Sequence, residues 1–198
     1  MNLIKNILNL VCCKILYRVK YVNLEKIKNV KRCLICPNHS NVLDPVFIYT
    51  KTDNLYIMAK SDLFKNKLIR WLLLKYNIFP TNREKIDFKS LYHSLEIFNN
   101  NNEGRKLLMF PEGRVIKKKE DIGKYYRKGA VYISANCNIP IIPVYITMRP
   151  LFFSKVTVTF GEPIYIKKEE LNSKQEIENK SKMLIQKIYE LNNERGKS

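Results

Sequence analysis

One of only two histidines in this chain, His39, lies five residues before an aspartate, Asp44. A histidine that takes up a proton needs a carboxylate on its other ring nitrogen, because the carboxylate fixes the tautomer and stabilises the imidazolium. Asp44 is close enough in sequence to supply that carboxylate. The pair is therefore a candidate general base with its orienting partner. The alternative is an ordinary helix start beside an unrelated histidine, since Asp-Pro commonly begins a helix.

The residues around this pair indicate a strand, a tight loop and a helix. Successive helical residues turn by about 100°, so His39 and Asp44 would point apart within one regular helix. The apolar run 33–36 predicts a buried strand before them. We therefore place His39 in the loop, Asp44 at the N-cap of the next helix and Pro45 at its first position, where the missing N–H does no harm.

Three further segments carry candidate site residues. The buried strand expected at 106–110 runs into Pro111-Glu112-Gly113-Arg114, which predicts a turn that presents a carboxylate and a cation at the edge of a sheet. Ligands of α/β proteins usually bind at such an edge. The apolar segment 77–80 is followed by Arg83. The proline-containing apolar segment 139–146 predicts another strand. Each segment alone also has an ordinary structural explanation.

Together, and in this order, the four segments resemble the glycerophosphate/lysophosphatidate acyltransferase family. Its blocks N-H-x-x-x-x-D, G-A-F-P-V-[DN]-R, F-P-E-G-T-R and P-I-x-P-V are matched by residues 38–44, 78–83, 110–113 and 140–144. A short K-G-A stretch of the family also has a counterpart at 128–130. The sequence departs from the pattern twice: Asn77 replaces the glycine that opens the second block, and Arg114 follows Gly113 directly, without a threonine between them.

The resemblance implies transfer of an acyl group from a thioester, or sometimes an acyl phosphate, to a hydroxyl. His39 would be the general base that deprotonates the acceptor, and Asp44 would orient its imidazole. An alcohol is a poor nucleophile near neutral pH, and a positioned base typically contributes about 10²–10⁴-fold. The sequence has no G-x-S-x-G nucleophile elbow, and this chemistry requires no covalent enzyme intermediate.

The resemblance also implies an acceptor that carries a phosphate, which needs cations. Arg83 and Arg114 are the candidates, because the guanidinium fork matches phosphate oxygens. For Arg83 the alternative is a solvated surface residue. Glu112 would fix an arginine or accept hydrogen bonds from backbone N–H groups, and Gly113 would let the backbone approach the ligand. These four residues are the expected substrate-binding residues.

The function that follows is acylation of 1-acylglycerol 3-phosphate (lysophosphatidate) to phosphatidate, with acyl-CoA or acyl carrier protein as donor. Two alternatives stay open. The acceptor could be another hydroxylated molecule, such as glycerol 3-phosphate or a different lysolipid, or the fold could serve a non-catalytic protein that binds membranes or acidic partners. We expect neither a metal ion nor a cofactor.

Composition narrows the range of partners. The chain has 198 residues and a formal net charge of +18, which suits nucleic acid, an anionic membrane or an acidic protein. It contains no zinc-finger, RNP or helix-turn-helix signature, so we expect an anionic membrane surface and no nucleic acid. Five cysteines, an odd number, suggest reduced thiols. Cys33 and Cys36 fall in one expected strand, where they would face opposite sides of a sheet rather than share a metal ion.

The hydrophobic pattern alternates between the two types of element. We expect strands near 33–36, 55–59, 76–80, 106–110, 141–147 and 155–160. We expect helices near 45–52, 61–75, 86–99, 128–137 and 170–193. This alternation predicts an α/β protein with a mostly parallel central sheet flanked by helices, preceded by an N-terminal amphipathic helix.

Two helices carry wide apolar faces with basic flanks, which is typical of helices at a membrane surface. The first spans residues 2–18, with a stripe of leucine, isoleucine and valine, and the second spans 61–75, which contains Trp71. The alternative for both is packing against the sheet. We expect residues 1–20 to be a membrane-associating helix, residues 21–198 to be the acyltransferase domain, and the protein to attach peripherally to the cytoplasmic face of the cell membrane.

Overall fold

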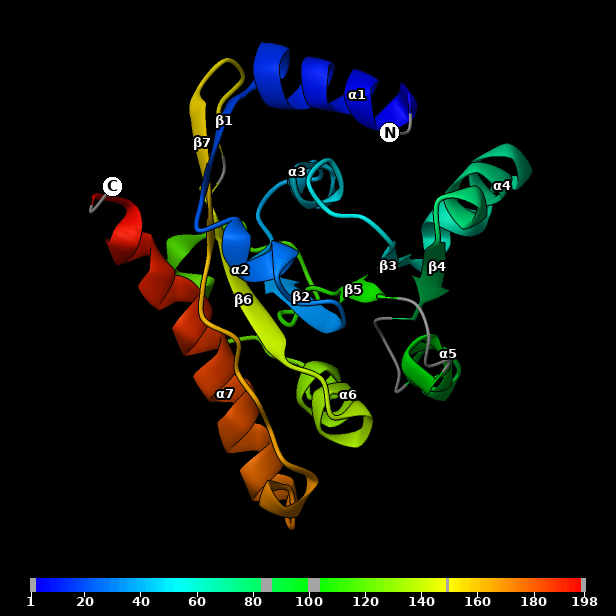
Figure 1. Cartoon of the computed structure of the whole chain (residues 1–198), viewed down its shortest axis with the longest axis vertical. Coiled ribbons are helices and arrows are strands. Elements are labelled where there is room, and N and C mark those ends of the chain that lie inside the picture. Colours follow the sequence, from blue (N-terminus) through cyan, green and yellow to red (C-terminus); the bar gives the residue numbers. More distant parts are fainter. Residues whose placement is uncertain (1–2, 83–86, 100–103, 149, 197–198) are drawn as a thin grey trace.

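Seven strands form one twisted sheet with helices on both faces in the computed structural model, which describes residues 3–82, 87–99, 104–148 and 150–196 (Figure 1). The strands are β1 (Arg18–Val22), β2 (Cys33–Pro37), β3 (Leu55–Lys60), β4 (Ile78–Thr81), β5 (Lys106–Leu108), β6 (Ile141–Ile146) and β7 (Lys155–Phe160). Their order across the sheet is β1-β7-β6-β2-β5-β3-β4.

All neighbouring strands run parallel except β6 and β7, which are antiparallel. The predicted α/β class with a mostly parallel sheet is therefore confirmed. β2 lies at the centre, with β5 on one side and β6 on the other. All five of its residues are buried, as expected for a strand that is covered on both faces.

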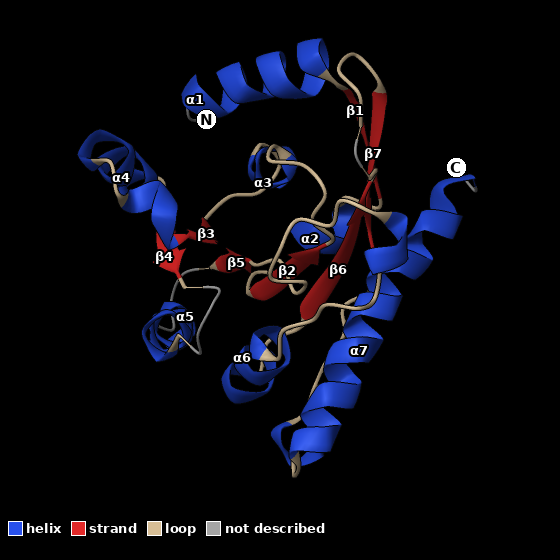
Figure 2. Ribbon diagram, turned by 180° about the vertical axis from the view of Figure 1, so that it is seen from behind, coloured by secondary structure: helices blue, strands red, loops and turns tan. Residues whose placement is uncertain are grey.

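The helices form two layers, one on each face of the sheet (Figure 2). Their bounds are α1 (Leu3–Leu8), α2 (Glu25–Lys28), α3 (Asp44–Tyr49), α4 (Lys67–Lys75), α5 (Phe88–Asn99), α6 (Gly129–Cys137) and α7 (Lys174–Glu190). Shorter or irregular helical turns are η1 (Asn9–Leu16), η2 (Ser61–Phe64), η3 (Lys119–Asp121), η4 (Lys168–Glu170) and η5 (Leu191–Gly196). In both views α1, α2 and α3 lie on one face, whereas α5, α6 and α7 lie on the other.

Two apolar clusters hold these layers to the sheet. Cys33 and Ile35 of β2 pack in the cluster beneath η1, α2 and α3, whereas Leu34 and Cys36 pack in the cluster beneath α5, α6 and α7. Cys33 and Cys36 thus face opposite sides, as predicted. Burial raises the pKa of the Cys33 thiol to about 12, so this cysteine stays protonated as part of the core.

Several element boundaries differ from the prediction. β1 is not predicted from the sequence, because the helix predicted over 2–18 overlaps its first residue. The helical segment ends at Leu16, and the edge strand begins at Arg18. The expected strand at 106–110 ends at Leu108, after which the backbone turns into the segment that carries Glu112. The expected helix at 61–75 is divided into η2 and α4.

The membrane-surface helices predicted from the sequence both leave apolar side chains exposed. On α1 and η1 these are Leu3, Ile7, Leu10, Val11 and Ile15, and on α4 they include Leu68, Trp71 and Leu74. Within the described residues, no helix is both long enough and apolar enough to cross a membrane.

Candidate active site

His39 and Asp44 meet in a buried pair at the carboxyl edge of the sheet. The Nδ1 atom of His39 lies 3.0 Å from Oδ2 of Asp44, and neither residue is more than 6% exposed. Among the described residues, no group hydrogen-bonds to Nε2 of His39. The ring of Phe110 stacks on the imidazole with centroids 3.9 Å apart, which restricts its rotation.

The role of Asp44 in the loop differs from the predicted N-cap. Leu43 occupies the cap, and Asp44 is the first residue of α3. Its side chain turns back into the loop, where Oδ2 accepts hydrogen bonds of 2.8 Å from the backbone N–H groups of both Ser40 and Asn41. The carboxylate therefore organises the loop around His39 as well as holding the imidazole, because both N–H groups and the imidazole converge on its Oδ2.

Asn38 anchors the same loop to the neighbouring strand. Its side-chain amide donates to the carbonyl oxygen of Ile146 at 3.0 Å and its oxygen accepts from the N–H of Ile146 at 2.7 Å. Asn38 thus continues the pairing of β2 with β6 past the end of the strand, using a side chain in place of backbone. We call residues 38–44 the histidine loop.

Glu112 fastens the histidine loop from the next strand. Because β2 and β5 are parallel neighbours, the segments that leave them emerge at the same edge, and Glu112 Oε2 accepts from the N–H of His39 at 2.8 Å. Its other oxygen, Oε1, accepts from the hydroxyl of Tyr189 on α7 at 2.6 Å. The second of the two predicted roles for Glu112, accepting from backbone N–H, is the one that the structure contains. The sequence analysis missed Tyr189.

The environment of Glu112 strongly perturbs its ionisation. The residue is 2% exposed, and burial raises the pKa of its carboxyl to about 7 against the opposing effect of the hydrogen bonds from Tyr189 and His39. The negative charge of Asp44 acts in the same direction as burial. Burial and the neighbouring Glu112 also raise the pKa of the Tyr189 hydroxyl, which therefore remains a donor.

The turn after Glu112 needs a glycine. Gly113 has φ +69°, and a Cβ atom built there would lie 2.7 Å from Nε of Arg127. Arg114 follows on the surface, with its guanidinium 4.4 Å above the ring of Tyr125. Two residues further, the N–H of Ile116 donates to the carbonyl oxygen of His39 at 2.7 Å. The turn therefore brings Arg114 and Arg127 near the histidine loop, and the sequence analysis missed Arg127.

The second family block, matched by residues 78–83, lies only partly within the residues that the structure describes. Arg83 lies outside the described residues. Asn77, which replaces the family's glycine, has φ +57°, a left-handed conformation that asparagine tolerates better than most residues. The backbone shape that a glycine would give is thus kept, and β4 begins at the next residue.

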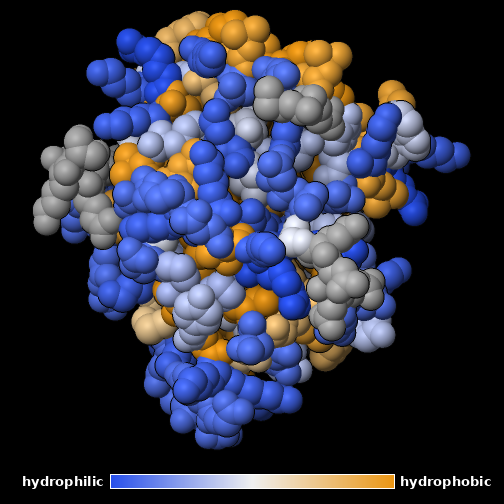
Figure 3. All heavy atoms as spheres, viewed as in Figure 1, coloured by the Kyte–Doolittle hydropathy of each residue, from blue (hydrophilic) through white to orange (hydrophobic). Residues whose placement is uncertain are grey.

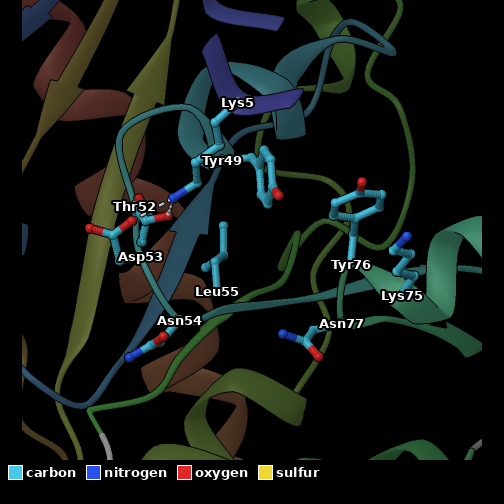
Figure 4. Close-up of a pocket in the computed structure, with 9 residues that line it drawn as sticks. All are labelled: Lys5, Tyr49, Thr52, Asp53, Asn54, Leu55, Lys75, Tyr76 and Asn77. Atoms are coloured by element: carbon cyan, nitrogen blue, oxygen red, sulfur yellow. Dashed lines mark hydrogen bonds and ion pairs between the residues drawn. The ribbon is translucent and has the colours of Figure 1, made fainter. Parts of the chain in front are cut away.

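A cavity of about 450 Å³, with Asn77 in its lining, lies away from the histidine loop and Glu112 (Figure 4). It is lined by Lys5, Tyr49, Thr52, Asp53, Asn54, Leu55, Lys75, Tyr76 and Asn77. These residues come from α1, the end of α3, the start of β3 and the loop before it, the end of α4 and the segment just before β4, at the edge of the sheet opposite to His39. Within the cavity Lys5 is paired with Asp53 at 2.6 Å, and none of the residues that line it belongs to the histidine loop.

A parallel α/β sheet with a carboxylate-oriented histidine at its carboxyl edge defines a class of protein equipped for general-base chemistry on a bound ligand. A profile of the family described as Acyltransferase matches residues 18–147. The chain belongs to this family.

Three curated relatives carry the name 1-acyl-sn-glycerol-3-phosphate acyltransferase. The protein of Streptococcus pneumoniae is 29% identical over 155 residues, which cover 74% of this chain and 55% of that protein. The protein of Bacillus subtilis is 28% identical, with 88% of each chain covered. The protein of Borreliella burgdorferi is 27% identical, with 73% of this chain and 56% of that protein covered. The chain therefore spans about half the length of two of these relatives.

A solved structure shares the fold. The crystal structure of the 1-acyl-sn-glycerophosphate acyltransferase of Thermotoga maritima superposes with a TM-score of 0.60. The match covers 86% of this chain and 72% of that chain at 20% sequence identity. The arrangement of sheet and helices described above is thus that of a known acyltransferase.

Proposed function

We propose that this protein acylates the free hydroxyl of 1-acylglycerol 3-phosphate to give phosphatidate, with acyl-CoA or acyl carrier protein as donor. The observation that carries the proposal is the buried His39–Asp44 pair at the carboxyl edge of the sheet. The names of the three curated relatives support the choice of acceptor.

In this mechanism Asp44 holds the proton of His39 on Nδ1, which leaves the lone pair of Nε2 for the acceptor hydroxyl. His39 takes the hydroxyl proton as the oxygen attacks the thioester carbonyl, and returns a proton to the departing thiolate. The acyl group moves directly from donor to acceptor. Glu112 takes no part in this proton transfer, because both of its oxygens are engaged in holding the loop.

The acceptor's phosphate is bound by Arg83 and Arg114, with Glu112 and Gly113 shaping the turn that presents Arg114. Arg127 adds a third cation, because its side chain packs against Gly113 and its N–H donates to the carbonyl oxygen of Pro111 at 2.7 Å. A phosphate ester carries up to two negative charges, which a single arginine does not neutralise.

The protein attaches peripherally to the cytoplasmic face of the cell membrane, with residues 1–20 as the membrane-associating segment and residues 21–198 as the acyltransferase domain. The exposed apolar side chains of α1 and η1 support this arrangement. Both the substrate and the product of the proposed reaction are lipids that reside in a bilayer.

The test is an acyl-transfer assay with the purified full chain and labelled 1-acylglycerol 3-phosphate, using acyl-CoA and acyl carrier protein donors in separate reactions. Formation of phosphatidate that depends on His39 supports the proposal. Glycerol 3-phosphate is the matched alternative acceptor. Faster acylation of glycerol 3-phosphate would overturn the acceptor, and no transfer to either would overturn the activity.

A further inference from the structure

A second hollow of about 450 Å³ lies between the end of η1 and the first residues of β1 and β7. It is lined by Cys13, Lys14, Arg18, Val19, Lys20, Lys155 and Thr157. Four of these seven residues are cations, and none of the described residues that line it is acidic. We call Lys14, Arg18, Lys20 and Lys155 the basic cleft.

The strand register forces the positive charges of the basic cleft together. Arg18 of β1 is paired with Lys155 of β7, so the two side chains stand on the same face of adjacent strands, which lie about 4.8 Å apart. Lys20 lies two residues along β1 and therefore on that face as well. Like charges directly opposite each other destabilise a sheet unless an anion lies between them.

The partners of these cations within the protein are few. The guanidinium of Arg18 donates to the carbonyl oxygen of Phe153 at 3.1 Å, which fixes its position without neutralising it. Lys14, Lys20 and Lys155 form no ion pair with any described residue. An anion bound in the basic cleft would thus find one fixed guanidinium, three adjustable ammonium groups and the hydroxyl of Thr157.

Exposed apolar side chains border the basic cleft and indicate where the anion comes from. The tip between β6 and β7 exposes Leu151, Phe152 and Phe153, each at least 64% accessible. The N–H of Phe153 donates to the carbonyl oxygen of Leu16, which joins the tip to the end of η1 and its own exposed residues. Figure 3 shows hydrophobic side chains gathered over the end of the molecule where α1, η1 and this tip lie.

We propose that the basic cleft binds the phosphate of an anionic phospholipid headgroup while the tip and η1 enter the acyl layer beside it. Apolar side chains next to unpaired cations fit a bilayer surface, which offers hydrocarbon and negative charge within a few ångströms of each other. The proposal rests on the membrane attachment proposed above and adds to it a headgroup site at a defined place.

The same geometry sets the bilayer close to the histidine loop. Because β7 is antiparallel to β6 and Ile146 at the end of β6 pairs with Val158, the first residues of β7 extend past the end of β6, at the edge from which His39 emerges. Tyr17 connects the two places: its ring lies 5.8 Å from that of Phe152, and its hydroxyl accepts a hydrogen bond from the side-chain amide of Asn41 at 3.4 Å. A lipid in the basic cleft would thus hold the membrane surface at the catalytic edge.

The test is co-sedimentation of the full chain with vesicles of phosphatidylcholine alone or of phosphatidylcholine with an equimolar amount of phosphatidylglycerol. We compare the wild type with the triple variant Lys14→Gln, Lys20→Gln, Lys155→Gln. The matched control loses the same charge from α5, η4 and α7, through Lys89→Gln, Lys168→Gln and Lys174→Gln. Triple substitution of the cleft lysines by arginine serves as the rescue variant.

We expect the cleft variant to bind the anionic vesicles roughly 100-fold more weakly than the wild type, because each lysine near an anionic surface contributes about a factor of five. The control variant should weaken by less than about threefold, and the arginine variant should bind like the wild type. Acyl transfer to a detergent-dispersed acceptor should be unchanged in all three variants.

Two results would overturn the headgroup site while leaving membrane attachment in place: wild-type affinity in the cleft variant, or equal losses in the cleft and control variants, which would mean that attraction depends on net charge alone. A wild-type protein that sediments with neither kind of vesicle would instead overturn the membrane attachment and the headgroup site together. The acyl-transfer assay is independent of all three results.

Discussion

The histidine loop and the basic cleft lie at the same edge of one sheet, but their charged groups are in opposite environments. At the histidine loop the carboxylates of Asp44 and Glu112 are buried, and backbone N–H groups, a tyrosine hydroxyl and an imidazole bind three of their four oxygens; Oδ1 of Asp44 has no hydrogen-bond partner among the described residues. In the basic cleft the cations face outward, with no acidic partner among the described residues. The first region takes most of its hydrogen-bond partners from within the protein and can be preorganised for chemistry, whereas the cations of the second have no acidic partner among the described residues.

The largest effect is expected when the proposed general base is removed from the histidine loop, which tests whether this region carries the chemistry. His39→Ala should lower kcat/KM for acyl transfer by about 10²-fold or more, because the acceptor hydroxyl loses its general base. Circular dichroism and thermal unfolding should show that the variant still folds. A folded variant with near-wild-type activity would contradict the assigned mechanism. Asp44→Asn should also lose activity, because an amide does not offset the imidazolium charge.

The next effect concerns the phosphate. Arg114→Ala should raise the KM for the phosphorylated acceptor by roughly ten- to a hundred-fold, the consequence of losing a charge-assisted hydrogen bond. The KM for the acyl donor should stay the same. Arg114→Lys should recover part of the loss, since an ammonium keeps the charge but lacks the fork. Unchanged acceptor binding in Arg114→Ala would place the phosphate on other cations.

The preorganisation of the histidine loop should be visible as a pH-dependent stability. Burial raises the pKa of Glu112 to about 7 in the folded protein from the ordinary 4.5. The folded state therefore favours the protonated carboxyl. The contribution to the free energy of unfolding is full below about pH 4.5 and is lost as the pH rises to about 7, with a magnitude on the order of 3 kcal/mol.

Urea denaturation at several pH values between 4.5 and 7 measures this contribution. In Glu112→Gln the decline with rising pH should be smaller than in the wild type, because glutamine does not titrate. Glu169→Gln, which changes an exposed glutamate on η4, is the control and should retain the wild-type slope. Equal slopes in all three proteins would mean that Glu112 titrates normally.

The smallest effect is expected at Tyr189. Tyr189→Phe removes a neutral donor to Glu112 and should lower stability by about 1 kcal/mol and kcat by a few-fold, with little change in KM. Because that hydrogen bond lowers the pKa of Glu112, its loss should move the pH-dependent decline upward. Tyr165→Phe, at an exposed position, is the matched control. A large increase in KM would show that Tyr189 touches substrate rather than positioning the loop.

The comparison also shows which contacts can be predicted from sequence. The spacing of His39 and Asp44 is sufficient to predict their pairing, because the two residues are close in sequence and the predicted strand, loop and helix place Asp44 beside His39. The prediction that Asp44 is the N-cap was wrong. Its side chain accepts hydrogen bonds from two loop N–H groups that precede the helix, and not from N–H groups of the helix itself. Local sequence patterns do not distinguish these two uses of one carboxylate.

Contacts between segments that are distant in sequence were harder to predict. Glu112 could be placed at the sheet edge from its position after a strand, but its bond to His39 depends on β2 and β5 being neighbours, and strand order is not encoded locally. Tyr189 belongs to a long amphipathic helix, and nothing in its periodicity singles out one tyrosine. The basic cleft was missed for a similar reason, because it exists only where β1 pairs with β7.

That last pairing has a consequence for the order in which the molecule is completed. β1 begins at Arg18, but the one strand that pairs with it among the described residues, β7, begins at Lys155. During synthesis β1 must wait, unpaired, until the residues between Val22 and Lys155 have been made, and closing such a long loop is slow. The catalytic edge between β2, β5 and β6 can form earlier. The basic cleft is therefore completed only when β7 emerges, and the support of Glu112 by Tyr189 follows later still, because α7 comes after β7 in the chain.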